Sequence, residues 1–414
     1  MKFLIICLIF LSATIEAKLK IEISQGSKDL AKIAIVPFND GKKINIALSD
    51  LIEKNLTLFG EFKATPKNEM LSFPSSEDNF FYRDWNILKI DYAVIGNLEE
   101  KNNSEFYIEY FVFNVPLKKL ILRGDITGDI NELSQISKVI SNRTYKAITG
   151  LEGIFNTKLA YILNPQKEIY KICVSDIDGS NEQILFESTA PLMSPSWSSD
   201  NKKLAYVSFE KGYPEIYMQD LFSGKRESIK TLGLSNSAPV WSPDNKKLAF
   251  VMSMSGNPDI YIYDLRNKKI SRHTTHYGID TEPSWSPNSK KLLFTSNRSG
   301  SPQIYELTIS SNRIKRITLD GDYNARASYF PNGKDIVLVH GNNGIFHIGT
   351  KKIRSRFINT ISKTTLDESP TISPNGNIII YATKNNSQGY LAGLTLDGKS
   401  KFTLPTKFGS VREP

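Results

Sequence analysis

A repeat with a step of 43 or 44 residues constrains this chain more than any other feature. The three best-kept copies read Pro-x-Trp-Ser and place their Trp at positions 197, 241 and 285; the two worn copies have Tyr329 and Ile372 there. Each copy continues through a turn into an apolar strand, such as Lys247-Leu248-Ala249-Phe250, and then into two more short strands. Units of this length with four strands predict β-propeller blades. A single blade cannot bury both faces of its sheet, so the blades are expected to stack around a ring.

The two ends of the repeat region predict how the ring closes. Residues 158–162 match the second strand of the repeat, but no Pro-x-Trp-Ser unit precedes them. Pro414 lies 44 residues after Pro370, and residues 410–414 resemble the approach to Pro283. The C-terminus is therefore expected to supply the missing strand of the first blade, which gives six blades and leaves the ring without an open edge.

The first 150 residues follow a different pattern. Residues 31–38 and 92–96 predict strands, 105–123 predict a hairpin, and 44–59 and 131–149 have apolar residues at helical spacing. This order predicts a small α/β domain at 25–150 before the propeller at 151–414. The predicted fold class is thus an α+β N-terminal domain followed by an all-β six-bladed β-propeller.

The N-terminus predicts the compartment. Met1-Lys2, the apolar run from Phe3 to Leu11 and a region ending at Ala17 are typical of a secretory signal peptide at 1–17. No later segment is long and apolar enough to cross a membrane, so the mature chain is not expected to be membrane-embedded. After cleavage Cys173 is the remaining cysteine, and its place in an apolar strand favours a buried, inert thiol over a reactive one.

The formal net charge of +9 raises the question of an anionic partner. The basic residues are mostly Lys, scattered among Asp and Glu, and the chain has neither an Arg-rich arm nor the aromatic and basic strand pattern of an RNA-binding sheet. We therefore expect no nucleic-acid partner.

These features together resemble the TolB family, the periplasmic component of the Tol-Pal system. The resemblance covers the whole mature chain and is most specific at the junction Ile148–Tyr161 and at Pro191–Ser198. It implies a monomeric periplasmic scaffold that is not an enzyme and needs no cofactor or metal. Such a scaffold links the lipoprotein Pal, at the outer membrane and peptidoglycan, with TolA of the inner membrane, and supports outer-membrane integrity and cell division. Other outer-membrane proteins stay open as further partners.

The resemblance also assigns site residues. The segment 18–24 occupies the position of the family's TolA-binding segment, with contacts expected from Leu19, Lys20, Ile21, Glu22 and Ile23. An alternating strand at a free terminus can add to a sheet edge, but the same pattern also suits a plain terminal strand of the small domain. Both interpretations hold if the strand exchanges between docked and released states and Pal binding shifts the populations. Pal is expected at the propeller mouth, on loops that contain Met193, Ser235, Asn236, Asp280, Thr281, Glu282, Arg326, Asp367 and Glu368.

Two alternative functions remain at this stage. A periplasmic propeller hydrolase with a site in the central channel would need acidic or His residues converging on the inner strands. A generic periplasmic propeller would bind another envelope protein. His273-x-x-His276 could suggest a metal, but on a strand these side chains diverge. His340 and His347 flank a hairpin turn and are expected to be a cross-strand pair; Asp176-x-Asp178 and Asp320-x-Asp322 are expected to be turns.

Overall fold

The computed structural model describes residues 20–23, 30–38, 43–101, 105–230, 235–254, 256–385, 388–404 and 409–414. The predicted signal peptide and Leu19 lie outside the described residues. No helix in these ranges combines the length and apolar character that a membrane span requires.

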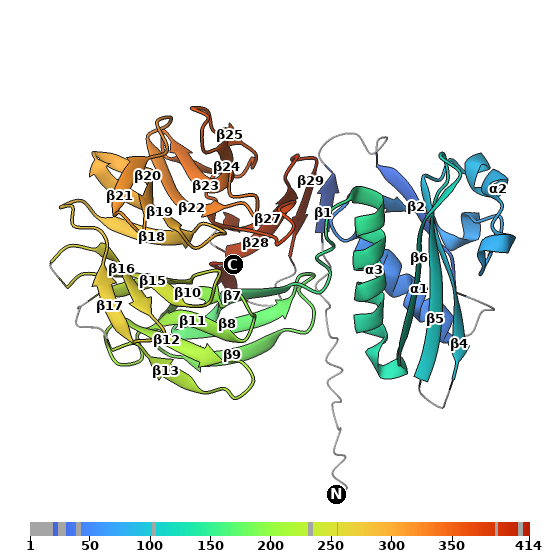
Figure 1. Cartoon of the computed structure of the whole chain (residues 1–414), viewed down its shortest axis with the longest axis horizontal. Helices are drawn as coiled ribbons and strands as arrows, with labels where there is room; N and C mark the ends of the chain where they lie inside the picture. The colour runs from blue at the N-terminus through green and yellow to red at the C-terminus, as the bar shows by residue number, and fades with distance from the viewer. Residues whose placement is uncertain are drawn as a thin grey trace, which may run out of the picture.

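Within the described residues, six sheets surround a central channel, with the C-terminus near its centre (Figure 1). Each blade has an innermost first strand and an outermost fourth strand. The blades, with strands in this order, are: blade 1, β30 (Ser410–Arg412), β7 (Lys158–Gln166), β8 (Ile169–Asp176) and β9 (Gln183–Ser188); blade 2, β10 (Leu192–Trp197), β11 (Lys203–Ser208), β12 (Glu215–Asp220) and β13 (Arg226–Ser228); blade 3, β14 (Asn236–Trp241), β15 (Lys247–Met252), β16 (Asp259–Asp264) and β17 (Lys269–Arg272); blade 4, β18 (Asp280–Trp285), β19 (Lys291–Ser299), β20 (Ser301–Thr308) and β21 (Arg313–Arg316); blade 5, β22 (Tyr323–Tyr329), β23 (Asp335–Asn342), β24 (Ile345–Lys352) and β25 (Asn359–Thr360); blade 6, β26 (Glu368–Ile372), β27 (Ile378–Asn385), β28 (Gln388–Thr395) and β29 (Ser400–Thr403).

The C-terminal strand β30 pairs antiparallel with β7 and occupies the innermost position of blade 1, where the repeat expects the C-terminus. The predicted six-bladed propeller is therefore confirmed.

The turn after each inner strand explains the recurring Ser-Pro-Asp-Asn sequence. In blade 3 the Ser242 hydroxyl donates to Asp244 at 2.6 Å and accepts from the Lys247 N–H at 2.9 Å. Asn245 adopts a left-handed φ of 54°, as Asn tolerates and most residues do not. We call this end of the propeller the turn end, and the opposite end, where the inner strands begin, the mouth end.

The core of the ring lies between neighbouring blades. Trp241 of blade 3 packs with Ala205 and Val207 of blade 2, and Trp285 of blade 4 packs with Ala249 and Val251 of blade 3. The indole N–H of Trp285 also donates to the Val240 carbonyl of the preceding blade at 3.1 Å. The Trp of the repeat thus joins blades, because each sheet needs its neighbour to bury its face.

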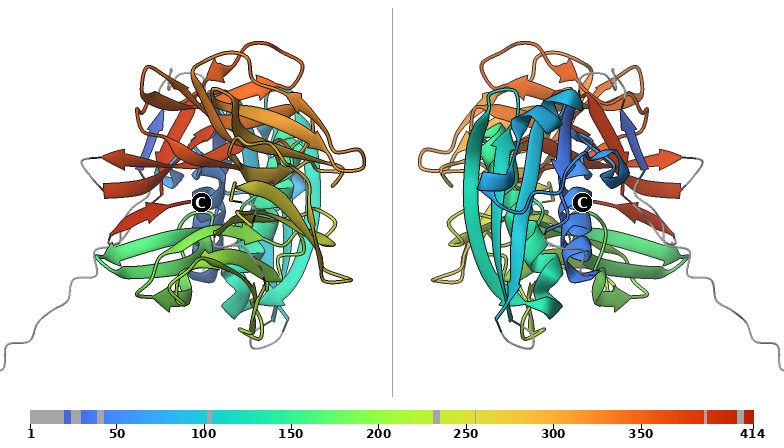
Figure 2. Two further views of the ribbon diagram at one scale, coloured as in Figure 1. Left: turned by 90° about the vertical axis from the view of Figure 1, so that its left-hand side faces the viewer. Right: turned by 90° about the vertical axis from the view of Figure 1, so that its right-hand side faces the viewer.

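The small domain is one mixed sheet with helices on both faces. Its strand order is β3-β2-β4-β5-β6, in which β2 pairs parallel with β3 and β4, and the remaining pairs are antiparallel. Helix α2 lies on the face away from the propeller, and α1 and α3 lie on the propeller side (Figures 1 and 2). The elements are β2 (Ala31–Ile35), α1 (Lys43–Thr57), β3 (Phe62–Ala64), η1 (Lys67–Glu69), η2 (Glu77–Asn79), α2 (Tyr82–Ile87), β4 (Tyr92–Glu100), β5 (Glu105–Asn114), β6 (Lys119–Asp129), η3 (Ile130–Glu132) and α3 (Leu133–Thr149).

The core beneath α1 and α3 continues into the seam where the ring closes. The same apolar cluster contains Ile52 and Ile140 of the small domain, Tyr161 of blade 1 and Leu391 of blade 6. The small domain therefore packs against the two blades that the C-terminus joins.

The position of strand β1 (Lys20–Ile23) rules out the alternative that this segment is a terminal strand of the small domain. The strand does not join the sheet of the small domain but pairs antiparallel with β29 as a fifth strand of blade 6, with Lys20 opposite Thr403 and Ile23 opposite Ser400. An outer edge strand offers unpaired N–H and C=O groups, and β1 satisfies them.

Candidate functional site: the mouth and channel of the propeller

The channel is lined by a ring of six residues that the repeat holds in an unusual backbone conformation. One residue per blade, just inside the mouth end, has a left-handed φ between 48° and 55°: Ser194, Ala238, Glu282, Arg326, Ser369 and Glu413. In blades 2 to 6 the register of the inner strand shifts at this residue, which is the signature of a β-bulge. Residues other than Gly rarely adopt this backbone conformation, because it costs each of them about 1–3 kcal/mol.

All six ring residues line one channel with a cavity volume of about 790 Å³. Arg326 is its cationic centre. The Arg326 Nε donates to Glu282 Oε1 at 2.8 Å, its backbone N–H donates to Glu282 Oε2 at 3.0 Å, and its Nη1 donates to Ser369. Burial disfavours the charged guanidinium, but the neighbouring Glu282, Glu413 and Glu368 outweigh it and raise the pKa of Arg326. The channel wall therefore carries fixed charges of both signs.

The structure divides the nine predicted mouth residues into three groups. Met193, Thr281, Glu282 and Arg326 line the channel. Ser235 is exposed and Glu368 is half-buried at the mouth end. Asn236, Asp280 and Asp367 are buried.

The three buried members are engaged inside the protein. Both carboxylate oxygens of Asp280 accept from Arg298 Nη2, at 2.7 and 2.9 Å, and Asn236 Nδ2 donates to the Pro214 carbonyl at 3.0 Å. The Asp367 carboxylate accepts from Thr364 at 2.5 Å and from Ser362. These groups hold the mouth loops in place, because a buried carboxylate without such partners is costly.

Sequence reasoning missed an apolar rim around the mouth. Seven large apolar side chains are between 44% and 85% exposed in the loops and strand starts at this end: Tyr213, Met254, Tyr277, Ile279, Leu319, Ile345 and Leu366. They have no periodic pattern, but their place in the repeat, between strands 2 and 3 or between strand 4 and the next blade, could have identified them. Exposed apolar side chains gathered around a polar centre are typical of protein-binding surfaces.

The outer edge of blade 6 is a second site. Its strand β29 pairs with β28 on one edge and with β1 on the other, and its side chains contact the small domain. The Ser400 hydroxyl donates to the Phe59 carbonyl at 2.5 Å, and the rings of Phe402 and Phe59 lie 5.3 Å apart. The N-terminal strand therefore docks beside the junction of the two domains.

Polar contacts also join the small domain to blade 1. The Asp176 carboxylate, 1% exposed, accepts from Lys138 Nζ of α3 at 2.6 Å, from Asn181 Nδ2 at 2.7 Å, and from Lys158 Nζ. Burial alone would raise the pKa of Asp176, but these hydrogen bonds outweigh it and lower the pKa to about 2. Asp176 ends β8, and its carbonyl accepts from the Gly179 N–H in the turn that the sequence predicts. Its role at the domain junction was not predicted.

Two further contacts hold the junction. Lys54 of α1 pairs with Asp178 at 2.8 Å. Glu61 accepts from Tyr145 at 3.0 Å and from Asn377 of blade 6 at 2.8 Å. These contacts fix the small domain to the turn end of blades 1 and 6, opposite the mouth end.

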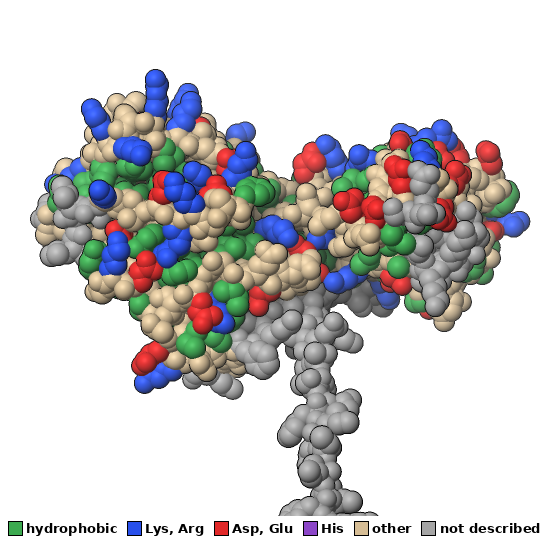
Figure 3. All heavy atoms as spheres, turned by 90° about the horizontal axis from the view of Figure 1, so that it is seen from below, with side chains coloured by type: hydrophobic (Ala, Val, Ile, Leu, Met, Phe, Trp, Pro, Cys, Tyr) green, Lys and Arg blue, Asp and Glu red, His purple; other side chains and the backbone are tan. Residues whose placement is uncertain are grey.

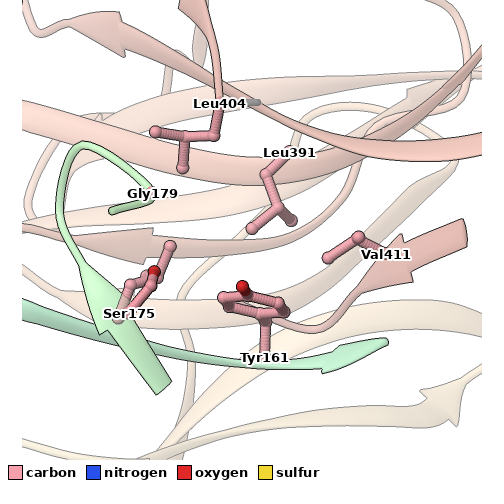
Figure 4. Close-up of a pocket in the computed structure, with 7 residues that line it drawn as sticks. Tyr161, Ser175, Gly179, Leu391, Leu404 and Val411 are labelled. Atoms are coloured by element: carbon pink, nitrogen blue, oxygen red, sulfur yellow. The ribbon is translucent and has the colours of Figure 1, made fainter. Parts of the chain in front are cut away.

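A small cavity lies at the seam of the ring. This cavity of about 10 Å³ lies between blades 1 and 6. The side chains of Tyr161 and Val411 point into it from blade 1, and those of Leu391 and Leu404 from the blade 6 side (Figure 4). This volume is at most that of one water molecule. The closing strand thus contributes Val411, which is 1% exposed, to the apolar contact between blades 1 and 6.

The remaining candidate groups do not converge in the part of the chain that the structure describes, which contains no group of three His, Cys, Asp or Glu side chains placed to hold a metal. His273 contacts Asn312 at 2.8 Å, and His276 accepts from the Gly278 N–H at 2.9 Å. His340 and His347 are directly opposite on β23 and β24, which confirms the predicted cross-strand pair. Cys173 is buried, and burial raises the pKa of its thiol to about 12.

Fold and site together define a class: a two-domain propeller protein whose open mouth combines an apolar rim with a charged channel. Comparison with known proteins identifies the family. Residues 145–414 match the family described as the TolB beta propeller domain, and residues 19–121 match the TolB amino-terminal domain. The chain belongs to the TolB family of Tol-Pal system proteins.

The similarity to individual relatives extends over nearly the full length. The chain is 52% identical to the Tol-Pal system protein TolB of Marinomonas sp. (strain MWYL1), over 99% of this chain and 96% of that protein. It is 50% identical to the corresponding protein of Hahella chejuensis, over 98% and 96% of the two chains. The crystal structure of TolB from Acinetobacter baumannii superposes with a TM-score of 0.87 at 36% identity, covering 96% of this chain and 98% of that one.

Proposed function

We propose that this chain is a non-enzymatic scaffold of the periplasm, to which a cleaved signal peptide at 1–17 directs it. In this proposal it binds Pal at the propeller mouth and TolA through residues 18–24. Its membership of the Tol-Pal family supports a role in that system. The observation that carries the proposal for Pal is the apolar rim, which lies at the same end of the propeller as Glu282 and Arg326 of the channel. A folded partner that covers this rim would bury apolar surface around a charged centre, as specific interfaces do.

The test for the mouth is a titration of the mature chain with the periplasmic domain of Pal. Thr281→Arg places a long cation in the channel wall and is expected to weaken binding more than tenfold. Ser199→Arg, an exposed position at the turn end, makes the same charge change and is the matched control. Loss of binding in both variants, or in neither, would contradict a Pal site at the mouth. Failure of the unmodified chain to bind Pal would favour a propeller with another envelope partner.

The proposal for TolA rests on the pairing of β1 with β29. TolA is proposed to pair with the same edge of β1 that β29 occupies in blade 6, so TolA binding requires the released state. Pal and TolA are then coupled through one equilibrium: a partner that favours the docked state lowers the apparent affinity for TolA.

A reversible disulfide tests this exchange. Glu22 lies opposite Lys401 in the register, so Glu22→Cys with Lys401→Cys is expected to lock β1 onto blade 6. The oxidised protein should lose TolA binding, and reductant should restore it. The single variant Lys401→Cys, which cannot form this bond, controls for the substitution. Undiminished TolA binding by the oxidised form would contradict the proposal that TolA binds the released strand.

A further inference from the structure

The turn end of blades 2 to 5 repeats one lysine at a fixed place. Lys202, Lys246, Lys290 and Lys334 follow one another at a step of 44 residues, and all four are exposed. Their carbonyls accept from the residue that begins the turn between strands 3 and 4 of the same blade: Leu221, Leu265, Ile309 and Ile353, at 2.9, 3.0, 3.1 and 2.9 Å. Each lysine therefore lies beside that second turn.

The second turns add more positive charge. In blades 2 to 5 the two turns span residues 198–203, 220–226, 242–247, 264–269, 286–291, 308–313, 330–335 and 352–358, and contain 16 Lys and Arg against five Asp and Glu. The ion pairs described for this chain include only Lys225, Arg226 and Lys291 among these cations. We call this surface the basic face.

Blades 1 and 6 lack this property and are the blades that the small domain covers. The position of the repeated lysine is Thr157 in blade 1 and Asn377 in blade 6, with the same backbone hydrogen bond at 3.0 and 2.8 Å. Asp176 and Asp178 make the second turn of blade 1 acidic, and they pair with Lys138 and Lys54 of the small domain. The small domain thus takes the acidic part of the turn end and leaves the basic face open.

Two phenylalanines stand out from the basic face. Phe222 is 85% exposed in the second turn of blade 2, beside Lys202, and Phe357 is 75% exposed in blade 5, beside Arg356. Ile353 and Ile358 pack against the core between blades 4 and 5, so they anchor the loop that presents Phe357. Exposed aromatic side chains among Lys and Arg are typical of proteins that lie on membrane surfaces.

We propose that the basic face docks onto the surface of an anionic phospholipid bilayer. Its cations are distributed over four blades at one end of a ring rather than gathered in a pocket, which suits a broad array of phosphate groups. The two phenylalanines, on separate blades, would enter the apolar layer below the headgroups. Figure 3 shows many Lys and Arg side chains on the surface of the propeller, with Asp and Glu side chains among them. This inference goes beyond the partners proposed above and concerns the opposite end of the propeller.

Co-sedimentation with vesicles tests the proposal on the mature chain alone. The chain is expected to bind vesicles of equal parts phosphatidylglycerol and phosphatidylcholine, to release them as salt is raised, and not to bind pure phosphatidylcholine. Arg354→Glu with Arg356→Glu should lower the partition coefficient at least about tenfold, since each Lys or Arg near such a surface contributes about 1 kcal/mol. Lys167→Glu with Lys384→Glu makes the same charge change at exposed mouth-end positions and should bind as the unmodified chain does.

A second variant distinguishes lipid from a soluble polyanion. Phe222→Ser with Phe357→Ser leaves every charge in place, so it should weaken vesicle binding severalfold while retention on immobilised polyglutamate stays unchanged. Retention on polyglutamate without vesicle binding would identify an acidic polymer as the partner and overturn the proposal. Absence of vesicle binding, or equal loss in the mouth-end control, would overturn it as well. All substituted residues are exposed, and circular dichroism checks that each variant folds.

Discussion

The mouth end and the turn end of the propeller are built from the same repeat, yet they differ in backbone, burial and charge. The mouth carries an apolar rim, a ring of left-handed residues and the buried carboxylates of Asp280 and Asp367. The turn end of blades 2 to 5 has short turns held by local side-chain hydrogen bonds, such as the one between Ser242 and Asp244, and an excess of cations. The period therefore places the two ends, the channel ring and the repeated lysines, whereas the apolar rim depends on loop residues that lie outside the period.

The largest expected difference between the ends concerns stability. Asp280→Ala in blade 4 leaves the Arg298 guanidinium, 14% exposed, without its carboxylate, and is expected to cost about 3 kcal/mol of unfolding free energy. At the turn end of the same blade, Asn288→Ala removes the acceptor of Ser286 at 2.8 Å and should cost about 1 kcal/mol. Chemical denaturation of the two variants measures both values. Equal losses of unfolding free energy in the two variants would contradict the idea that the mouth end depends on the buried ion pair of Asp280 and Arg298.

The acidic turn of blade 1 predicts a dependence on pH. Because the pKa of Asp176 in the folded protein is lowered to about 2, its contribution is fully present above the ordinary carboxyl pKa and is lost as pH falls through the folded value. Between pH 4 and pH 2 this loss is expected to be about 2 kcal/mol.

The variant Asp176→Asn sharpens this test. It should be less stable than the unmodified chain at pH 7, and its stability should change less between pH 4 and pH 2. Thermal unfolding across this range measures both quantities. If both proteins show the same acid dependence, Asp176 does not hold the domains together.

The periodic part of the structure was predictable from the sequence. The spacing of Trp197, Trp241 and Trp285 identifies the inner strands, and the position of Pro414 assigns the closing strand to the C-terminus. These predictions succeed because a repeat reports contacts that are local within a blade and identical between neighbouring blades.

The rest depends on contacts between residues far apart in the chain. The pairing of Lys20 with Thr403 and the contact of Lys138 with Asp176 have no local pattern, so the sequence predicted neither. The sequence places Asp280 at the mouth end of its strand. Whether its carboxylate faces a partner protein or the Arg298 guanidinium depends on packing, which the sequence does not show. The apolar rim was missed because its residues lie in loops without a period.

The proposed Pal site at the mouth end is tested most directly by comparing Tyr277→Ser with Phe222→Ser. The two side chains are equally exposed, at 85%, and lie at the mouth end and the turn end respectively. Calorimetric titration with the Pal periplasmic domain is expected to show at least about tenfold weaker binding for Tyr277→Ser, since buried aromatic side chains dominate interfaces. Phe222→Ser should bind Pal as the unmodified chain does. Unchanged binding by Tyr277→Ser together with weakened binding by Phe222→Ser would contradict the assignment of the Pal site to the mouth.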